Sequence, residues 1–194
     1  METKTKIFNA AAEIIKTKGF AYLTISNICK VAGVSNGTFF YHFKTKDDLL
    51  SAYTFERFAR FREERQFEAT VESYNYIDKI IEFYGYWADY MEEMGLELAS
   101  NFYNTKNTSL NNRLWNKRQP LDVWDYPGQV MRDAFDVGLL KTDKTADHYS
   151  EVIITMMKGV AFDWCLSEAA FNMRERIREI MLPYLRSISV PTVE

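Results

Sequence analysis

The stretch from Thr24 to Lys46 constrains the fold of this 194-residue chain more than any other. Its pattern predicts two short helices joined by a tight turn at Gly33, because glycine readily adopts the positive φ that such a turn requires. Thr24 and Ser35 stand directly before the two helices, where side chains that cap a helix N-terminus are expected. The stretch is therefore interpreted as a helix-turn-helix, which is typical of proteins that insert a helix into the major groove of DNA.

The second helix of this motif separates inward apolar residues from outward polar ones. Ile28, Val34 and Phe39 are expected to point inward and to hold the two helices at a fixed angle. Asn36, Thr38 and Tyr41 are expected to point outward. Asparagine can pair with adenine through two hydrogen bonds, and threonine offers a hydroxyl and a methyl that contacts thymine. Asn36 and Thr38 are the candidates for reading base edges.

Further matching residues are Ala32 to Ser35, Tyr41-His42-Phe43 and Leu49-Leu50. With these included, the stretch resembles the N-terminal helix-turn-helix of the tetracycline-repressor (TetR) family of bacterial transcription regulators. The resemblance is close to continuous from about Ile7 to Leu50, and beyond it the chain is similar to the family in length and helical character. It implies that the residues meeting DNA are Thr24, Ser35, Asn36, Gly37, Thr38, Phe40, Tyr41, His42, Lys44 and Lys46.

Two of these positions carry open alternatives. Phe40 stands where the family most often has a tyrosine whose hydroxyl reaches a phosphate. Phenylalanine cannot donate that hydrogen bond, so either DNA affinity is lower or Tyr41 substitutes. His42 is interpreted either as a phosphate contact or as a surface residue without a role. Cys29, where a small alanine is usual in the family, is expected to pack as a small apolar residue.

The distribution of charge supports DNA as a partner. The whole chain has a net charge of −3, but residues 1–46 hold seven lysines and two acids, which gives +5. Residues 47–194 hold seventeen basic and twenty-five acidic residues, which gives −8. A basic segment attached to an acidic remainder is typical of a small nucleic-acid-binding module joined to another domain.

Composition and helical periodicity predict an all-α chain of about nine helices. We expect a three-helix DNA-binding domain over residues 1–46 and a helical effector-binding and dimerisation domain over residues 47–194. The first helix is expected over residues 3–18, with Phe20 and Tyr22 closing the small core behind it. The later helices are expected at residues 46–65, 73–94, 96–103, 122–137, 145–171 and 173–188, with a flexible connection or a short helix over 104–120.

Several classes of function are disfavoured. The two cysteines and two histidines form no metal-ligand spacing, and no catalytic constellation is recognised, so neither an enzyme nor a metal or cofactor site is expected. No stretch is apolar enough to span a membrane, and the N-terminus lacks a signal-peptide pattern. We therefore expect a cytoplasmic protein.

The second domain is unusually rich in aromatic and methionine residues. Phe83, Trp87, Tyr90 and Met94 share one helix face, and nine such residues between Ser73 and Met94 exceed what one buried face needs. Some are expected to line a ligand cavity, together with acids (Asp89, Glu92, Glu93) that either attract a cationic ligand or face water. Asp163 either orients a ligand or satisfies a neighbouring group. The full set of ligand candidates is Phe83, Trp87, Tyr90, Met94, Phe102, Tyr103, Trp115, Trp124, Met131, Phe135, Met156 and Asp163.

The helix over residues 46–65 is expected to join the two domains and to expose its charged residues to solvent: Glu56, Arg57, Arg60, Arg62, Glu63, Glu64 and Arg65. The resemblance implies a homodimer that pairs its last two helices with their copies and binds a palindromic operator. It also implies a repressor that a small-molecule effector releases from DNA, and the aromatic residues and acids of the second domain suggest an aromatic or cationic effector. The alternatives are a DNA-bound assembly protein that binds a partner and no small molecule, and an activator.

Overall fold

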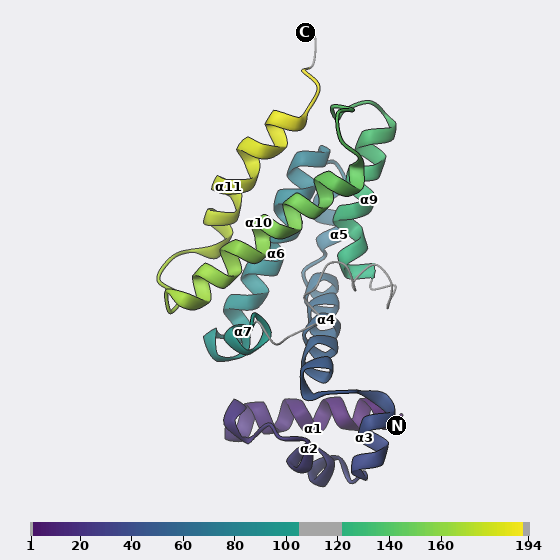
Figure 1. Cartoon of the computed structure of the whole chain (residues 1–194), viewed down its shortest axis with the longest axis vertical. Helices are drawn as coiled ribbons and strands as arrows, with labels where there is room; N and C mark the ends of the chain where they lie inside the picture. Colours follow the sequence, from purple (N-terminus) through teal and green to yellow (C-terminus); the bar gives the residue numbers. More distant parts are fainter. Residues whose placement is uncertain (1, 105–121, 192–194) are drawn as a thin grey trace.

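The computed structural model of the chain describes residues 2–104 and 122–191, and for residues 122–124 it describes the backbone only. Two parts are evident in Figure 1: a small head at one end and a larger helical body, connected by α4. The head contains α1 (Thr3–Lys18), a short 3-10 helix (Phe20–Tyr22), α2 (Ile25–Ala32) and α3 (Asn36–His42). The connecting helix α4 runs over Lys46–Glu64.

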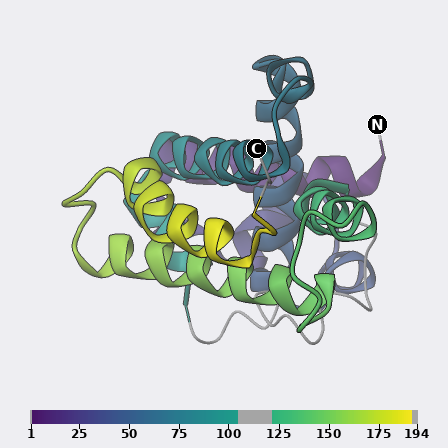
Figure 2. The same cartoon turned by 90° about the horizontal axis from the view of Figure 1, so that it is seen from above.

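The body is built from α5 (Phe67–Val71), α6 (Tyr76–Met94), α7 (Leu96–Phe102), α9 (Asp122–Asp136), α10 (Ala146–Leu166) and α11 (Met173–Ile188). Seen from above, α11 lies between α6 and α10 (Figure 2), and it makes its main contacts with these two helices. Regular structure in residues 2–104 and 122–191 is helical, apart from one antiparallel bridge between Leu140 and Ser189. The expectation of an all-α fold is confirmed. No helix in these ranges is long and apolar enough to cross a membrane.

Local sequence signals define the helices of the head. The Thr24 hydroxyl accepts a hydrogen bond from the Asn27 backbone N–H at 3.2 Å, which caps α2, and Gly33 ends that helix in the left-handed conformation with φ 66°. At the start of α4, Thr45 and Asp48 form the reciprocal pair of hydrogen bonds that defines a capping box, at 3.0 and 3.1 Å. The Thr24 cap stands where the sequence predicts it.

The head has its own apolar core, which extends beyond residue 46. Ile7, Ile28 and Phe39 are fully buried in it, and the rings of Phe8 and Phe43 meet edge to face at 5.4 Å. Leu49 and Leu50 of α4 belong to the same cluster, and so does Leu98 of α7. Phe20 closes this core as expected, but the expectation for Tyr22 is wrong: its side chain is 57% exposed, because Leu23 fills the inward position after the 3-10 turn.

Three differences from the expected helices occur in the body. Helix α6 begins at Tyr76 and not at Ser73, because the Asn75 side chain accepts a hydrogen bond from the Asp78 N–H at 3.0 Å and caps it there. A short helix, α5, precedes it and was not expected. Helix α10 ends at Leu166 and not at Phe171, because the chain turns through Glu168 and Ala169, both of which have positive φ. The segment over residues 104–120 lies outside the described residues except for Asn104.

Candidate DNA interface and effector site

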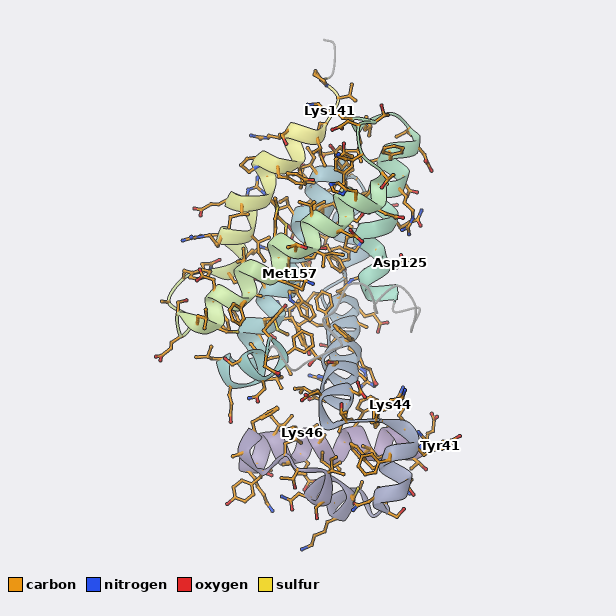
Figure 3. All side chains as sticks on the ribbon, in the orientation of Figure 1. Tyr41, Lys44, Lys46, Asp125, Lys141 and Met157 are labelled. Carbon is orange, nitrogen blue, oxygen red and sulfur yellow. The ribbon has the colours of Figure 1, made fainter. Side chains whose placement is uncertain are left out.

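Helix α3 presents one exposed surface at the edge of the head. Tyr41 is 85% exposed and Phe40 52% exposed, while Phe39 between them and the core is fully buried. Tyr41 projects outward from the head in Figure 3. Asn36 and Gly37 are exposed as well, and Thr38 is half-buried. The outward direction expected for Asn36, Thr38 and Tyr41 therefore agrees with the observed exposure.

The N-terminus of α3 is held by two hydroxyl groups. The Ser35 side chain accepts a hydrogen bond from the Thr38 N–H at 3.1 Å, and the two hydroxyl oxygens lie 2.9 Å apart. This arrangement fixes the Thr38 side chain against the helix end. Its methyl group and the remaining lone pair of its hydroxyl stay available to a ligand. Free backbone N–H groups at such an end favour an anion such as a phosphate.

Packing within the chain does not require a glycine at position 37. A Cβ atom built there would meet only the Ser35 hydroxyl, at 3.7 Å, which is an ordinary van der Waals contact. Gly37 also lies inside a helix, where alanine is intrinsically more favourable. The absence of a side chain at position 37 leaves room for another molecule to approach this surface closely.

The cationic and aromatic residues after Tyr41 differ in how far their side chains are exposed to solvent. Lys44 is exposed, whereas the Lys46 ammonium lies 5.0 Å from the centroid of the Phe20 ring and is half-buried. The His42 ring packs edge to face against Tyr41 at 5.0 Å. Figure 3 shows Lys46 on the side of the head that faces the body.

Cys29 lies between α2 and α3 and is 5% exposed, with its thiol 3.8 Å from the Ser35 carbonyl oxygen. Burial raises the pKa of this thiol, which keeps it protonated at neutral pH. Because a thiol reacts as its thiolate, these features agree with a packing role.

In the body, five of the twelve ligand candidates meet in one aromatic cluster: Phe83, Trp87, Tyr90, Phe102 and Tyr103. Phe83, Trp87 and Phe102 are fully buried, and the ring of Trp87 lies 5.7 Å from Tyr90 and 5.9 Å from Phe102. Phe58 of α4 meets Trp87 edge to face at 4.8 Å. The cluster therefore joins α4, α6 and α7, and it brings together residues that are distant in the sequence.

Three hydrogen bonds satisfy polar atoms inside this cluster. The Trp87 indole N–H donates to the Tyr103 hydroxyl at 2.7 Å, and that hydroxyl donates in turn to the Met157 sulfur at 3.5 Å. The Tyr90 hydroxyl donates to the Thr54 carbonyl oxygen at 2.9 Å. Burial raises the pKa of both tyrosines well above the usual value, so both remain protonated donors.

Three other buried polar atoms have no hydrogen-bond partner in the described part of the chain: Thr54 Oγ1, Arg62 Nε and Tyr84 Oη. Thr54 and Tyr84 are fully buried. Buried polar groups in proteins are nearly always hydrogen-bonded, and an unmade bond costs about 1–3 kcal/mol. Two of the three atoms belong to α4, the helix that connects the body to the head.

The remaining ligand candidates are placed less uniformly. Met131 is fully buried in the body core, and Met94, Phe135 and Met156 pack partly buried against it. Asp163 is exposed on α10, so it lies outside the buried core, and its two expected roles stay predictions. Trp115 lies outside the described residues, and only the backbone of Trp124 is described.

The three acids near the aromatic face of α6 are engaged within the chain. Asp89 accepts a hydrogen bond from Arg174 at 2.6 Å, Glu92 accepts one from the Met173 N–H at 3.1 Å, and Glu93 pairs with Arg65. These contacts connect α6 with α11 and with the end of α4. None of the three acids belongs to the aromatic cluster, which removes the reason for expecting a cationic ligand there.

Sequence reasoning missed the most unusual residue of the body. Arg62 was expected to face solvent with its charged neighbours on α4, but it is 7% exposed, because α5 folds back over it. Its guanidinium carbon lies 4.5 Å from the centroid of the Phe67 ring and 5.2 Å from that of Phe83. The signal that marks this burial is Phe67, an apolar residue five positions further along the chain.

Comparison with known proteins identifies the head. Residues 7–53 match the model of the bacterial regulatory proteins of the tetR family. The HTH-type transcriptional regulator UidR of Escherichia coli K12 is 27% identical over 166 residues, which cover 83% of this chain and 81% of UidR. The fatty acid metabolism regulator protein of Bacillus subtilis is 38% identical over 58 residues, 30% of each chain.

Solved structures share the whole fold. FadR of Thermus thermophilus, a TetR-family transcriptional repressor solved in complex with lauroyl-CoA, superposes with a TM-score of 0.76 at 20% identity and covers 98% of this chain and 97% of its own. FadR of Bacillus subtilis, solved with stearoyl-CoA, gives 0.58 at 18% identity, with 95% and 98% covered. The head, the relatives and the shared fold lead to one conclusion: residues 7–53 form a DNA-binding domain of the tetR family of bacterial regulatory proteins, and the chain is a DNA-binding regulator of transcription that is similar to TetR-family proteins along its length.

Proposed function

We propose that this protein is a repressor that a small-molecule effector releases from its operator. The observation that carries the proposal is the location of the unpartnered buried polar atoms. Thr54 Oγ1 and Arg62 Nε lie on α4, and Tyr84 Oη faces the interior from α6. A ligand that satisfies these atoms gains hydrogen bonds from the helix that carries the head, so its binding favours one position of α4 over another.

The DNA-binding residues proposed are those of α3 and its flanks. Asn36 and Thr38 read base edges, and Gly37 permits the close approach. Thr24, Ser35, Tyr41 and His42 contact phosphates, together with Lys44 and Lys46. Phe40 donates no hydrogen bond, and with 52% of its side chain exposed it offers an apolar contact instead.

The active form proposed is a homodimer that divides into a DNA-binding part, residues 1–46, and an effector-binding and dimerisation part, residues 47–194. Helices α10 and α11 lie side by side and expose Phe162, Leu166 and Ile180 at 43%, 67% and 41%. Apolar side chains in such numbers on two adjacent helices support a protein interface. A two-fold dimer then places two copies of α3 on the half-sites of a palindrome.

The effector proposed is an acyl-CoA or a related amphiphile. Two FadR proteins that share this fold were solved with lauroyl-CoA and stearoyl-CoA. The aromatic interior of the body suits the apolar part of such a molecule.

One experiment tests the proposal in two steps. Selection of bound sequences from random duplex DNA, titrated against salt, is expected to recover a single palindrome at an affinity well above that for random DNA. Lauroyl-CoA is then expected to release the protein from that palindrome. Recovery of sequence-blind, salt-sensitive binding alone contradicts a sequence-specific regulator, and a complex that lauroyl-CoA leaves intact contradicts this effector class.

The same exposed residues favour one alternative. If Phe162 and Leu166 bind a different protein, the chain is a DNA-bound assembly protein without an effector. The size of the free protein distinguishes the two cases, because the repressor is dimeric without any partner and the assembly protein is not.

A further inference from the structure

Arg62 is a buried cation at the place where α4, α5, α6 and α9 meet. Its side chain is 8% exposed. Its guanidinium lies over three aromatic rings, at 4.5 Å from the centroid of Phe67 and 5.2 Å from those of Phe83 and Tyr126. The rings of Phe83 and Tyr126 are themselves stacked, with centroids 5.5 Å apart. The aromatic faces hold the charge in place, but they provide no hydrogen-bond acceptor in the guanidinium plane.

Only one of the two donor nitrogens on one edge of this guanidinium makes a hydrogen bond within the described part of the chain. Its Nη2 atom donates to a carboxylate oxygen of Glu68, whereas no acceptor for the neighbouring Nε is found among the described residues. These two nitrogens share one edge of the plane, and a carboxylate or phosphate can accept from both at once. The edge therefore has the geometry of a two-point anion site with one point filled.

The carboxylate that fills it is easily displaced. The Glu68 side chain is 62% exposed, and it belongs to α5, a helix of five residues. Burial lowers the pKa of Arg62, and Glu68 opposes that effect only in part. An anion that accepts hydrogen bonds from both nitrogens therefore stabilises the charged form of Arg62 better than Glu68 does. The displaced Glu68 side chain moves into solvent at little cost.

We propose that Arg62 is the anchor for the acidic group of the effector, which binds the Nε–Nη2 edge as a carboxylate or phosphate in place of Glu68. This inference rests on the proposed function and adds the charge of the ligand to it. The apolar remainder of the ligand packs against the aromatic rings around Arg62. Because Arg62 belongs to the last turn of α4, a bound anion contacts the helix that carries the head and can shift its position.

Calorimetric titration with three probes tests the inference. Dodecanoate and dodecanol have the same chain length, but only dodecanoate carries an acid, and lauroyl-CoA carries phosphates in place of a free carboxylate. Wild type is expected to bind at least one of the two anionic probes roughly tenfold more tightly than dodecanol: dodecanoate if the site takes a carboxylate, lauroyl-CoA if it takes a phosphate. The reason is that a charge-assisted hydrogen bond is stronger than a neutral one.

Two variants locate the effect. Arg62→Lys keeps the charge but loses the two-point edge, and it is expected to bind the anionic probe roughly tenfold more weakly. Glu68→Gln removes the competing carboxylate and is expected to bind the same probe about threefold more tightly, without a change for dodecanol. Glu56→Gln is the matched control, because Glu56 also pairs with an arginine of α4, Arg60 at 2.8 Å, but outside the aromatic site. It is expected to change neither affinity.

The outcomes separate the inference from the proposed function. If wild type binds the anionic and neutral probes equally and Glu68→Gln alters neither, ligand binding stands and the role of Arg62 is wrong. If Arg62→Lys unfolds, Glu68→Gln still decides, because Glu68 is 62% exposed and the glutamine that replaces it keeps an oxygen that can accept a hydrogen bond from Arg62. If no probe binds wild type, both the proposed effector class and the anchor are overturned.

Discussion

Gly37 is a residue whose identity the fold of the chain does not require. Its position admits a methyl group, since the only neighbour within 4 Å is the Ser35 hydroxyl at 3.7 Å. Gly37→Ala is therefore expected to raise the free energy of unfolding by about 0.5–1 kcal/mol, the gain of alanine over glycine in a helix. The same methyl obstructs the approach to DNA, so operator affinity is expected to fall roughly tenfold, the cost of losing one base contact.

Urea denaturation and a DNA titration measure the two effects on one sample. A variant that is more stable and still binds the operator tightly would show that α3 does not approach DNA at Gly37. A variant that is less stable would contradict the packing given above.

Tyr103 and Tyr84 form a natural matched pair of buried hydroxyl groups. Tyr103 accepts the hydrogen bond of the Trp87 indole at 2.7 Å, whereas Tyr84 has no partner in the described part of the chain. Tyr103→Phe leaves a buried N–H without an acceptor and is expected to lower the free energy of unfolding by about 1–3 kcal/mol. Tyr84→Phe removes an unsatisfied group and is expected to be neutral or stabilising. Equal losses in urea denaturation would contradict this assignment.

Among the elements, α7 connects the body to the head independently of α4. Leu98 is 3% exposed and belongs to the head's apolar core, and Met94 at the end of α6 packs against the cores of both head and body. A displacement of α6 or α7 therefore reaches the head through packed side chains.

Leu98→Ala is expected to lower the free energy of unfolding by about 2–4 kcal/mol, the usual cost of such a cavity. Glu97→Ala on the same helix is the control, because Glu97 is exposed and its replacement is expected to change stability by less than about 0.5 kcal/mol. Thermal unfolding of both variants measures the difference. Similar melting temperatures for the two would mean that α7 does not support the head.

Elements defined by local signals could be predicted from the sequence, and those defined by distant contacts could not. The caps at Thr24, Ser35 and Thr45 bond to backbone N–H groups three residues away, so a short stretch of sequence contains the whole interaction. The burial of Arg62 depends on α5, α6 and α9 folding over one turn of α4. Periodicity along α4 alone assigns such an arginine to solvent.

The same distinction applies to the candidate sites. The outward residues of α3 follow from a single helix, and their exposure agrees with the prediction. The shared helix face of Trp87 and Tyr90 was expected, and their rings do meet, but the sequence did not indicate that Phe102 of α7 packs against Trp87 or that Thr54 of α4 accepts from Tyr90. Asp163 shows the limit of this reasoning: the sequence places an acid within an apolar helix, but it does not reveal that this side chain is exposed on α10.

At the scale of the whole molecule, the charge asymmetry and the exposed apolar surface of α10 and α11 both favour binding to DNA. The head carries +5 and the remainder −8, so DNA attracts one end of the molecule only. In the proposed dimer, each head reads one half-site of a palindrome, and the second copy doubles the contacts without any new residue. We therefore expect the dimer surface to matter for operator affinity as much as α3 does.

Phe162→Glu places a charge on this surface, where the side chain is 43% exposed in the single chain. The variant is expected to be monomeric at micromolar concentration in analytical ultracentrifugation, because burying an unpaired carboxylate is costly. Its affinity for a palindrome is expected to drop to about that for one half-site, while each head keeps its fold. Val137→Glu is the control, since Val137 is 72% exposed and follows the end of α9, so it belongs to neither α10 nor α11. Retention of the dimer by Phe162→Glu, or its loss in Val137→Glu, would place the interface elsewhere on the body.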